Sequence, residues 1–286
     1  MGQSKRIPSI SIAIPASFVA DTPHLREKTF RIGLISRASA IFRVNEIIVF
    51  RDLQKKNQNM DMELIASILS YMETPQYLRK CLFPFKPILK YVGILPPLRT
   101  PHHPLSKFIK NLNLNEYREG VIIKSDEKAS YVDIGVERPV LLQKPNLPIG
   151  KRITVKVIGL DNIPEITIVE NKEINIYWGY RVSFSNSTLG QIIKEGNFDL
   201  VIMTSRYGKP LTEVIVDIKK RWKQAVRVII AFGSPSEGLR EILAHEGLEI
   251  KKIADLTINV ILGQGTETVR TEEAIYATLS AINLII

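Results

Sequence analysis

The sequence VRVIIAFGSPSEGLREIL at residues 226–243 contains an apolar run, a turn-rich segment and a helical pattern, in that order. The same order returns in LTINVILGQGTETVRTEEAIYATLSAINLI at residues 256–285. A β-branched run predicts a strand, and Gly, Ser, Pro and Thr predict the loop that joins it to a helix. Loops at the carboxyl ends of parallel strands are where such sheets bind ligands. Two of these units in succession therefore predict an α/β fold with a ligand site at one sheet edge.

The first part of the chain shows the same alternation. Strands are predicted at 9–18 and 46–52, and the helix between them, 21–43, has Asp21 as its predicted N-cap. Further helices are predicted at 62–73 and, more briefly, after Pro75. After residue 170 the alternation resumes, with predicted helices at 187–196, 210–225, 236–247 and 271–285 (N-cap Thr271) and predicted strands at 198–205 and 226–233.

The middle of the chain has a different pattern. From about residue 105 to 168, the short β-type runs REGVIIKS, ASYVDIG, PVLLQK and KRITVKVIG are separated by turn signals. Regular short strands predict a small antiparallel barrel or sandwich, for which an OB-like barrel is the best fit. The α/β pattern surrounds this barrel, so we expect an insertion. The predicted organisation is 1–95 for the first part of the α/β domain, 96–170 for the barrel with its linkers, and 171–286 for the second part.

Three predicted loops share one sheet edge: TSRYG at 204–208, GSPSEG at 233–238 and NVILGQGTET at 259–268. Their glycines allow a ligand to approach the backbone closely. Each loop alone fits an ordinary strand-to-helix turn, whereas three at one edge favour a ligand site. They match neither the G-x-G-x-x-G dinucleotide fingerprint nor the GxxxxGK[ST] phosphate loop.

The positive charge lies in the first part of the chain. The formal net charge is +10, and residues 1–110 contain 17 Lys and Arg against 7 Asp and Glu, while residues 111–286 contain 22 of each kind. A localised basic excess favours a polyanionic partner such as nucleic acid. The alternative is a heavily charged surface of mixed sign. No apolar run approaches the ~20 residues that cross a bilayer, so we expect no membrane association.

Five segments carry a resemblance to a known family. They are PPLRTPHHP (96–104), YWGYRV (177–182), MTSRYG (203–208), FGSPSEGL (232–239) and NVILGQGTETVRTEEA (259–274). The chain resembles the SPOUT superfamily of S-adenosylmethionine-dependent RNA methyltransferases, which have the α/β-knot fold. Within it, the chain is most similar to the archaeal and eukaryotic branch that carries a β-barrel insertion. The resemblance covers essentially the whole chain.

The resemblance implies a parallel sheet with a C-terminal trefoil knot and a homodimer formed through the knot domain. It also implies S-adenosyl-L-methionine bound in the knot, hydrogen-bonded by backbone groups. By position in these motifs, the cofactor-binding residues are Thr204, Gly233, Glu237, Gly238, Leu256, Asn259, Gly263, Gln264, Gly265 and Thr266.

The resemblance suggests Arg206, Glu267 and Arg270 as catalytic residues. An arginine would orient the RNA or stabilise a developing anion, and a carboxylate could accept a proton. Glu267 also fits a structural acid at a helix start, and Arg270 fits either an RNA phosphate contact or an intersubunit ion pair. Eukaryotic members have an arginine after YWGY-x-V; this chain has Ser183, so Arg181 or Arg206 would replace it.

Several other residues have two interpretations. His102 and His103 lack further ligands, so we predict no metal site and expect linker packing or an RNA contact. Trp178 and Tyr180 could stack a base or pack between domains. The single Cys81 excludes an intramolecular disulfide, is consistent with a reducing cytoplasm, and is expected in the core.

The sequence therefore predicts a cytoplasmic, homodimeric, S-adenosylmethionine-dependent RNA methyltransferase. Ribosomal RNA is the favoured substrate, with a pyrimidine base nitrogen as the target. The alternatives are ribose 2′-O-methylation, or a non-catalytic RNA-binding or ribosome-assembly factor that dimerises through the knot. The RNA surface is expected to use the barrel and six basic residues of the first part: Arg26, Lys28, Arg31, Arg37, Lys55 and Lys56.

Overall fold

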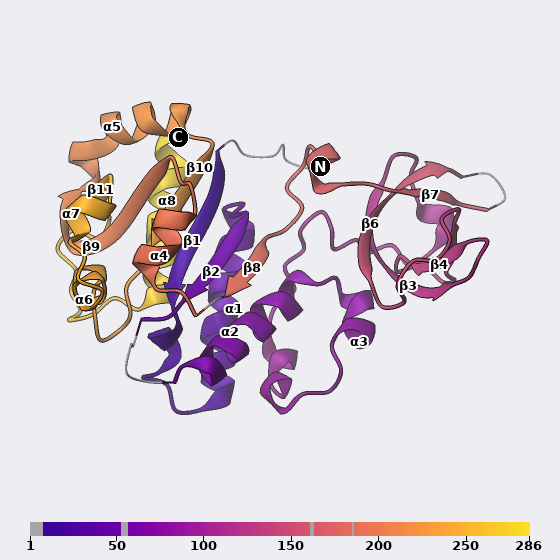
Figure 1. Cartoon of the computed structure of the whole chain (residues 1–286), viewed down its shortest axis with the longest axis horizontal. Coiled ribbons are helices and arrows are strands. Elements are labelled where there is room, and N and C mark those ends of the chain that lie inside the picture. The colour runs from indigo at the N-terminus through magenta and orange to yellow at the C-terminus, as the bar shows by residue number, and fades with distance from the viewer. Residues whose placement is uncertain (1–7, 53–56, 161–162, 185) are drawn as a thin grey trace. The chain divides into compact units, whose positions relative to one another are not determined.

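The computed structural model describes residues 8–52, 57–160, 163–184 and 186–286. Within these ranges the chain forms two compact units (Figure 1). The barrel unit consists of Tyr71–Pro87 and Pro97–Gly179. The α/β unit consists of the described residues up to Ser70, together with Ile88–Pro96 and Tyr180–Ile286.

The α/β unit is built on a 6-stranded sheet with the order β11-β9-β10-β1-β2-β8. Each neighbouring pair is parallel, as the alternating sequence pattern predicted. The edge strand β8 comes from the YWGYRV segment, where the sequence had given no strand signal. The strands are β1 Ser9–Pro15, β2 Glu46–Phe50, β8 Arg181–Phe184, β9 Leu200–Pro210, β10 Arg227–Ala231 and β11 Leu256–Asn259.

Helices cover this sheet on both faces, and Figure 1 shows α4 in front of it and α8 behind it. On the α4 face, Phe50 and Met203 pack with Leu189 of α4 and Leu239 of α6. On the other face α8 packs against α1. The helices are α1 Leu25–Ile41, α2 Asn59–Glu73, α4 Leu189–Glu195, α5 Leu211–Gln224, α6 Leu239–His245, α7 Ile250–Ile253 and α8 Thr271–Ile285.

Both helix caps predicted from the sequence are wrong. The N-cap of α1 is His24, whose ring accepts a hydrogen bond from Arg26 N. Asp21 lies earlier in the chain and its carboxylate pairs with the Arg31 guanidinium. The N-cap position of α8 is Arg270, while the Thr271 hydroxyl donates to the Gly233 carbonyl at 3.0 Å. In both cases the side chain predicted to cap the helix instead bonds to a residue elsewhere in the fold.

The barrel unit contains a 5-stranded antiparallel sheet with the order β5-β4-β3-β6-β7. Its outer strands β5 and β7 approach each other, so the sheet is nearly closed, which fits the predicted OB-like insertion. Inward-facing Ile122, Val132 and Val155 form its core. The strands are β3 Tyr117–Ser125, β4 Ser130–Asp133, β5 Val140–Leu142, β6 Arg152–Gly159 and β7 Glu165–Ile168.

The short helix α3 Arg79–Leu82 also belongs to the barrel unit. It carries Cys81, which is exposed, so the expectation of a core cysteine is wrong. The helix contains no buried residue, and an apolar neighbourhood in sequence is no guide to burial in so short an element.

A buried ion pair joins α1 to α8 in the α/β unit. The Arg31 Nε donates to Glu272 Oε1 at 2.7 Å and Nη2 donates to Oε2 at 3.2 Å. The side chains are 7% and 3% exposed, and Asp21 and Thr22 accept from the remaining guanidinium nitrogen. This pair fixes the first turn of α8 against α1.

We expect Arg31→Ala to lower the free energy of unfolding by about 3–5 kcal/mol, because Glu272 would remain as a buried charge without its partner. Urea unfolding followed by circular dichroism measures the change. Lys28→Ala is the matched control, because the Lys28–Asp61 pair is 19% and 31% exposed and should contribute at most about 1 kcal/mol. Equal losses in the two variants would contradict this interpretation of the α1–α8 pair.

Candidate functional site

The carboxyl edge of the sheet contains an unusual excursion in β9. Thr257 of β11 lies opposite Met203, but the next residue, Ile258, lies opposite Lys209. Residues 204–208 therefore bulge out between two consecutive residues of β11. The sequence had predicted a strand that ends at 205 and a loop at TSRYG; instead the strand resumes after the bulge.

Hydrogen bonds join this bulge to the loop 259–268. The Asn259 side-chain amide donates to the Arg206 carbonyl at 2.8 Å. The Arg206 guanidinium donates in return to the Glu267 carbonyl at 3.3 Å. Gln264 donates to the carbonyls of Thr266 and Glu267 at 2.8 and 3.1 Å, which folds the loop onto itself. The two predicted loops are thus one hydrogen-bonded assembly.

The third loop, 233–238, is joined to its neighbours through its start. The Thr204 hydroxyl donates to the Ala231 carbonyl at 3.0 Å, and Thr271 donates to the Gly233 carbonyl. The turn closes with Ser234 N donating to the Glu237 carbonyl at 2.9 Å. All three loops therefore meet at the carboxyl edge of β9, β10 and β11.

The glycines of this edge differ in what surrounds them. A Cβ on Gly208 would lie 2.5 Å from the Ile258 carbonyl carbon, so the bulge presses directly against β11. At Gly263, where φ is +63°, and at Gly265, an added Cβ would meet nothing within 4 Å. The open space along 263–265 and the close turn at Gly233 fit a ligand held by backbone groups. The residues present therefore fit the cofactor that the resemblance implies.

Of the predicted cofactor residues, Leu256 lies in β11 opposite Ile202, and Gly238 is the N-cap of α6. The Glu237 carboxylate lies 3.2 Å from His245 Nε2 on the same side of α6. The structure brings most of the predicted residues to this edge: Thr204, Arg206, Gly233, Glu237, Gly238, Asn259, Gly263, Gln264, Gly265, Thr266 and Glu267.

Arg270 takes part in a neighbouring feature. It lines a hollow of about 660 Å³ together with Arg26, Glu27 and Phe30 of α1. The other lining residues are Asp21, Thr22, Pro23, Arg31 and Ile94. Arg270, which follows the loop 259–268 in the chain, is the predicted site residue that belongs to the lining of this hollow.

Comparison with known proteins now identifies the family. The family model described as "Putative RNA methyltransferase" matches residues 9–282. The chain belongs to this family. The resemblance to RNA methyltransferases inferred from the five motifs is confirmed.

Named relatives of the chain include the 28S rRNA (uridine-N(3))-methyltransferase of Drosophila melanogaster, 34% identical over 96% of this chain and 61% of that protein. The Homo sapiens protein of the same name is 31% identical over 96% of this chain and 77% of that protein. The chain thus spans less than two thirds of the Drosophila relative. Among solved structures, the SpoU methyltransferase AviRb of Streptomyces viridochromogenes aligns over 97% of this chain and 59% of that chain, with 9% identity and a TM-score of 0.37, too low to define the fold.

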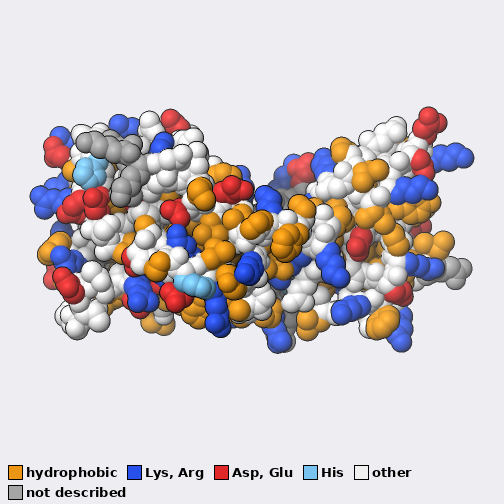
Figure 2. Space-filling model, turned by 90° about the horizontal axis from the view of Figure 1, so that it is seen from below, with side chains coloured by type: hydrophobic (Ala, Val, Ile, Leu, Met, Phe, Trp, Pro, Cys, Tyr) orange, Lys and Arg blue, Asp and Glu red, His pale blue; other side chains and the backbone are white. Residues whose placement is uncertain are grey.

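The basic surface of the protein differs from the one predicted. Arg31 is buried in its ion pair, and Lys28 pairs with Asp61, so neither is available as expected. Arg26 is exposed, and Lys55 and Lys56 lie outside the described residues. Figure 2 shows Lys and Arg side chains mixed with Asp and Glu over one face rather than gathered in a single patch. Arg37 is half-buried on α1.

Arg181 is also misplaced in the sequence-based prediction. It lies opposite Glu46 at the start of β2, which is the amino edge of the parallel sheet, away from the three loops. Burial would raise the pKa of Glu46, but hydrogen bonds from Ser183 and Arg181, at 2.6 and 2.7 Å, outweigh it and lower that pKa. Of the two arginines Arg181 and Arg206, Arg206 is the one that lies at the edge of the three loops.

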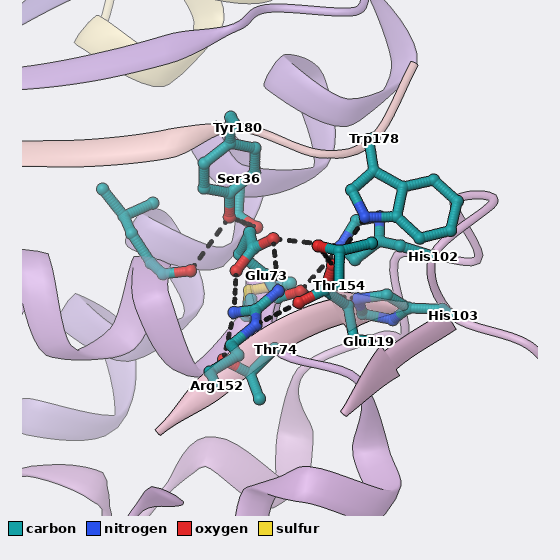
Figure 3. Close-up of polar contacts among 12 residues, drawn as sticks. Ser36, Glu73, Thr74, His102, His103, Glu119, Arg152, Thr154, Trp178 and Tyr180 are labelled. Atoms are coloured by element: carbon teal, nitrogen blue, oxygen red, sulfur yellow. Dashed lines mark hydrogen bonds and ion pairs between the residues drawn. The ribbon is translucent and has the colours of Figure 1, made fainter. Parts of the chain in front are cut away.

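Figure 3 shows a second polar cluster, inside the barrel unit. Arg152 donates to Glu73 at 2.7 and 3.0 Å and to Glu119 at 2.6 Å. Burial would raise the pKa of Glu73, but the hydrogen bond from His102 and the charge of Arg152 lower it to about 2. The Trp178 indole donates to Glu119 as well. No sequence signal grouped these residues, which are far apart along the chain.

The two histidines of this cluster have a packing role. Both ring Nε2 atoms lie within hydrogen-bond distance of the Glu73 carbonyl, at 2.8 Å for His102 and 2.7 Å for His103. His102 is fully buried. In the described part of the chain, no group of three or more His, Cys, Asp or Glu is placed to hold a metal ion. Tyr180, in the α/β unit, is buried with its hydroxyl bonded to Ser36 and the Leu69 carbonyl, so it cannot stack a base.

Across the residues that the structure describes, no helix has both the length and the apolar character needed to cross a membrane.

The barrel-unit cluster generates a prediction about acid stability. Burial, together with the neighbouring His102, lowers the pKa of His103 from 6.5 to about 3. Below pH 6.5 the unfolded chain gains a proton that the folded chain does not, so stability is complete above that pH and falls towards pH 3. The slope should reach about 1.4 kcal/mol per pH unit for this proton. Glu73 adds a further loss between pH 4.5 and 2.

Trp178 fluorescence in a Trp222→Phe background reports on the barrel unit during urea unfolding at pH 7.5 and pH 5. We expect His103→Gln, which keeps a donor for the Glu73 carbonyl but does not titrate, to reduce the stability difference between the two pH values. His245→Gln, an exposed histidine, is the control and should leave that difference unchanged. If His103→Gln shows the full wild-type difference, the proposed titration is wrong.

Proposed function

We propose that this chain transfers a methyl group from S-adenosyl-L-methionine to N3 of a uridine in ribosomal RNA. Family membership and the names of the relatives, which methylate uridine N3 in 28S rRNA, support the reaction. The observation that carries the proposal is the assembly at the sheet edge, where the bulge 204–208 and the loop 259–268 hold each other through Asn259 and Arg206.

The cofactor would lie against the backbone of 233–238 and 263–266, with Thr204, Leu256 and Asn259 around it. Bound there, S-adenosylmethionine supplies a methyl group on a sulfonium that a nitrogen lone pair attacks in line. Because glycines line the site, no side chain separates the backbone from the cofactor. Backbone N–H groups can therefore approach both the adenine ring and the carboxylate of S-adenosylmethionine. Orientation of the RNA base is then the main task of the remaining residues.

Arg206 and Glu267 would act on the base. N3 of uracil carries a proton and lies between two carbonyl groups. Loss of this proton therefore places negative charge on O2 and O4. The Arg206 guanidinium, fixed at the edge by its contact to the Glu267 carbonyl, would stabilise that charge. The exposed Glu267 carboxylate would accept the proton.

Arg270 and Arg26 would contact RNA phosphate. Both line the same hollow, and both are exposed. Arginines that face a hollow next to a base-modifying site would position the backbone of the strand without reading its sequence.

We also infer that the C-terminal part of the chain is threaded through a preceding loop as a trefoil knot. The support is the path of the chain. β11 is an edge strand beside β9, yet the first residue of α8, Thr271, bonds to Gly233 after β10, and Glu272 pairs with Arg31 of α1. The segment between them crosses the bulge 204–208, to which it is hydrogen-bonded. A crystal structure with bound cofactor would test both the threading and the pocket.

We place the reaction in the cytoplasm, where the single, exposed Cys81 would stay reduced. Fractionation of cells with an antibody against the chain tests that placement, and enrichment in another compartment would refute it.

The enzyme is proposed to act as a homodimer. Helices α1 and α8 pack together and present exposed apolar side chains, with Phe30 and Ile41 of α1 at 49% and 50% exposure and Leu284 of α8 at 82%. An apolar surface on the knot-bearing unit would be covered by a second copy.

We expect Phe30→Glu to shift the sedimentation coefficient from dimer to monomer, because a carboxylate would be buried in the interface. Val216→Glu, at an 81% exposed position on α5, is the matched control and should leave the dimer intact. A wild-type chain that sediments as a monomer would refute the dimer, and an unchanged Phe30→Glu dimer would place the interface elsewhere.

The methyl-transfer proposal predicts 3-methyluridine in rRNA from cells with the gene and its loss without it, measured by mass spectrometry of nucleosides. Calorimetry should show S-adenosylmethionine binding to the wild type and to Arg206→Ala alike, while Arg206→Ala should lose methylation by about 100-fold or more. Absence of cofactor binding would contradict both enzymatic hypotheses, methylation of uridine N3 and methylation of the ribose 2′-hydroxyl. Loss of a 2′-O-methylated nucleoside instead of 3-methyluridine would move the target to the ribose.

A further inference from the structure

Tyr207 lies at the tip of the bulge 204–208 and its side chain is 80% exposed. The guanidinium carbon of Arg206 lies 4.8 Å from the centre of its ring. One face of the ring is thus paired with a cation, while most of the side chain remains in contact with solvent. Tyr207 belongs to the MTSRYG motif, and the resemblance implied no role for it.

The backbone that carries this ring is fixed. The Tyr207 N–H donates to the Ser205 hydroxyl at 3.2 Å, and the carbonyl of Arg206 accepts from Asn259. The next residue, Gly208, is pressed against the Ile258 backbone. The Tyr207 side chain is therefore exposed on a segment whose backbone is fixed by these contacts, and not on a flexible loop.

Exposure alone does not distinguish Tyr207. Phe85 of the barrel unit is 92% exposed, and single exposed aromatic side chains are normal on protein surfaces. The difference is position: Tyr207 belongs to the bulge that forms one side of the candidate methyl-donor site, and its neighbours Arg206 and Lys209 are exposed cations. An open aromatic face beside positive charge is the surface on which bases of single-stranded RNA stack.

We propose that Tyr207 is a stacking platform for a nucleobase of the RNA substrate and positions that base beside the loops 233–238 and 259–268. This inference rests on the proposed function, since it assumes an RNA substrate at this edge. The Arg206 guanidinium covers the other face of the ring, so the Tyr207 ring lies between the guanidinium and the stacked base. Stacking therefore fixes a base of the strand at this edge without a direct contact to Arg206.

Tyr207 is a positioning residue, so the planar ring should matter and the hydroxyl should not. Removal of one base-stacking contact typically weakens binding by roughly 5- to 100-fold. We therefore expect Tyr207→Ala to weaken binding of RNA by an amount in that range and Tyr207→Phe to bind like the wild type. Affinity for S-adenosylmethionine should remain unchanged in both variants.

The experiment measures fluorescence anisotropy of a short fluorescein-labelled oligouridylate with the full chain. An abasic strand of the same length reports on phosphate contacts alone. Tyr207→Ala should lose affinity for the oligouridylate but not for the abasic strand, and Phe85→Ala, the matched exposed aromatic, should change neither. Thermal melting of each variant confirms that the fold is retained.

The proposal is overturned if the wild type binds both strands equally, if Tyr207→Ala binds the oligouridylate like the wild type, or if Phe85→Ala shows the same loss. These outcomes do not depend on methyl transfer. A failure of the proposed function would instead appear as absent cofactor binding or unchanged 3-methyluridine, so the two failures are distinguishable.

Discussion

The jump in pairing between β9 and β11 is the constraint on which the rest of the site depends. Because Thr257 pairs with Met203 and Ile258 with Lys209, residues 204–208 have to leave the sheet. A glycine is needed at 208, since a Cβ there would overlap the backbone of Ile258. The bulge then presents the Arg206 carbonyl to Asn259 and the side chains of Arg206 and Tyr207 to solvent. The placement of Arg206, Tyr207 and the loop 259–268 follows from this one irregularity.

The loop after β11 is held at both ends. Its start is fixed by Asn259, and its end is fixed because Thr271 bonds to Gly233 and Glu272 is buried against Arg31. A loop with fixed ends loses less conformational entropy when a ligand binds than a free one. The glycines at 263 and 265 leave space within it. The Arg31–Glu272 ion pair between α1 and α8 therefore contributes to the ligand site without belonging to its loops.

Most of the regular elements of the fold were predictable from the sequence, because periodicity and β-branched runs are local signals, although the edge strand β8 was missed. The features that failed are those decided by distant partners. Asp21 and Thr271 read as caps, but Arg31 and Gly233 take their side chains. The bulge could not be predicted either, since a strand that leaves a sheet and returns to it has the same composition as a strand followed by a loop. For the candidate site, the strand–loop–helix pattern located the three loops and the resemblance suggested what they bind, whereas the structure supplied their connections.

The distribution of charge bears on which contacts would supply affinity for RNA. Two of the basic residues expected to contact RNA, Arg31 and Lys28, are internally paired, and acidic side chains are mixed with basic ones on the face that Figure 2 shows. Paired cations release few counterions on binding, so these two residues add little electrostatic affinity for RNA. Contacts of shorter range would add to the affinity. Tyr207 is a fixed aromatic ring beside the Arg206 guanidinium, at the edge that would hold the methyl donor. Stacking on this ring would provide affinity for the strand and would also align one of its bases.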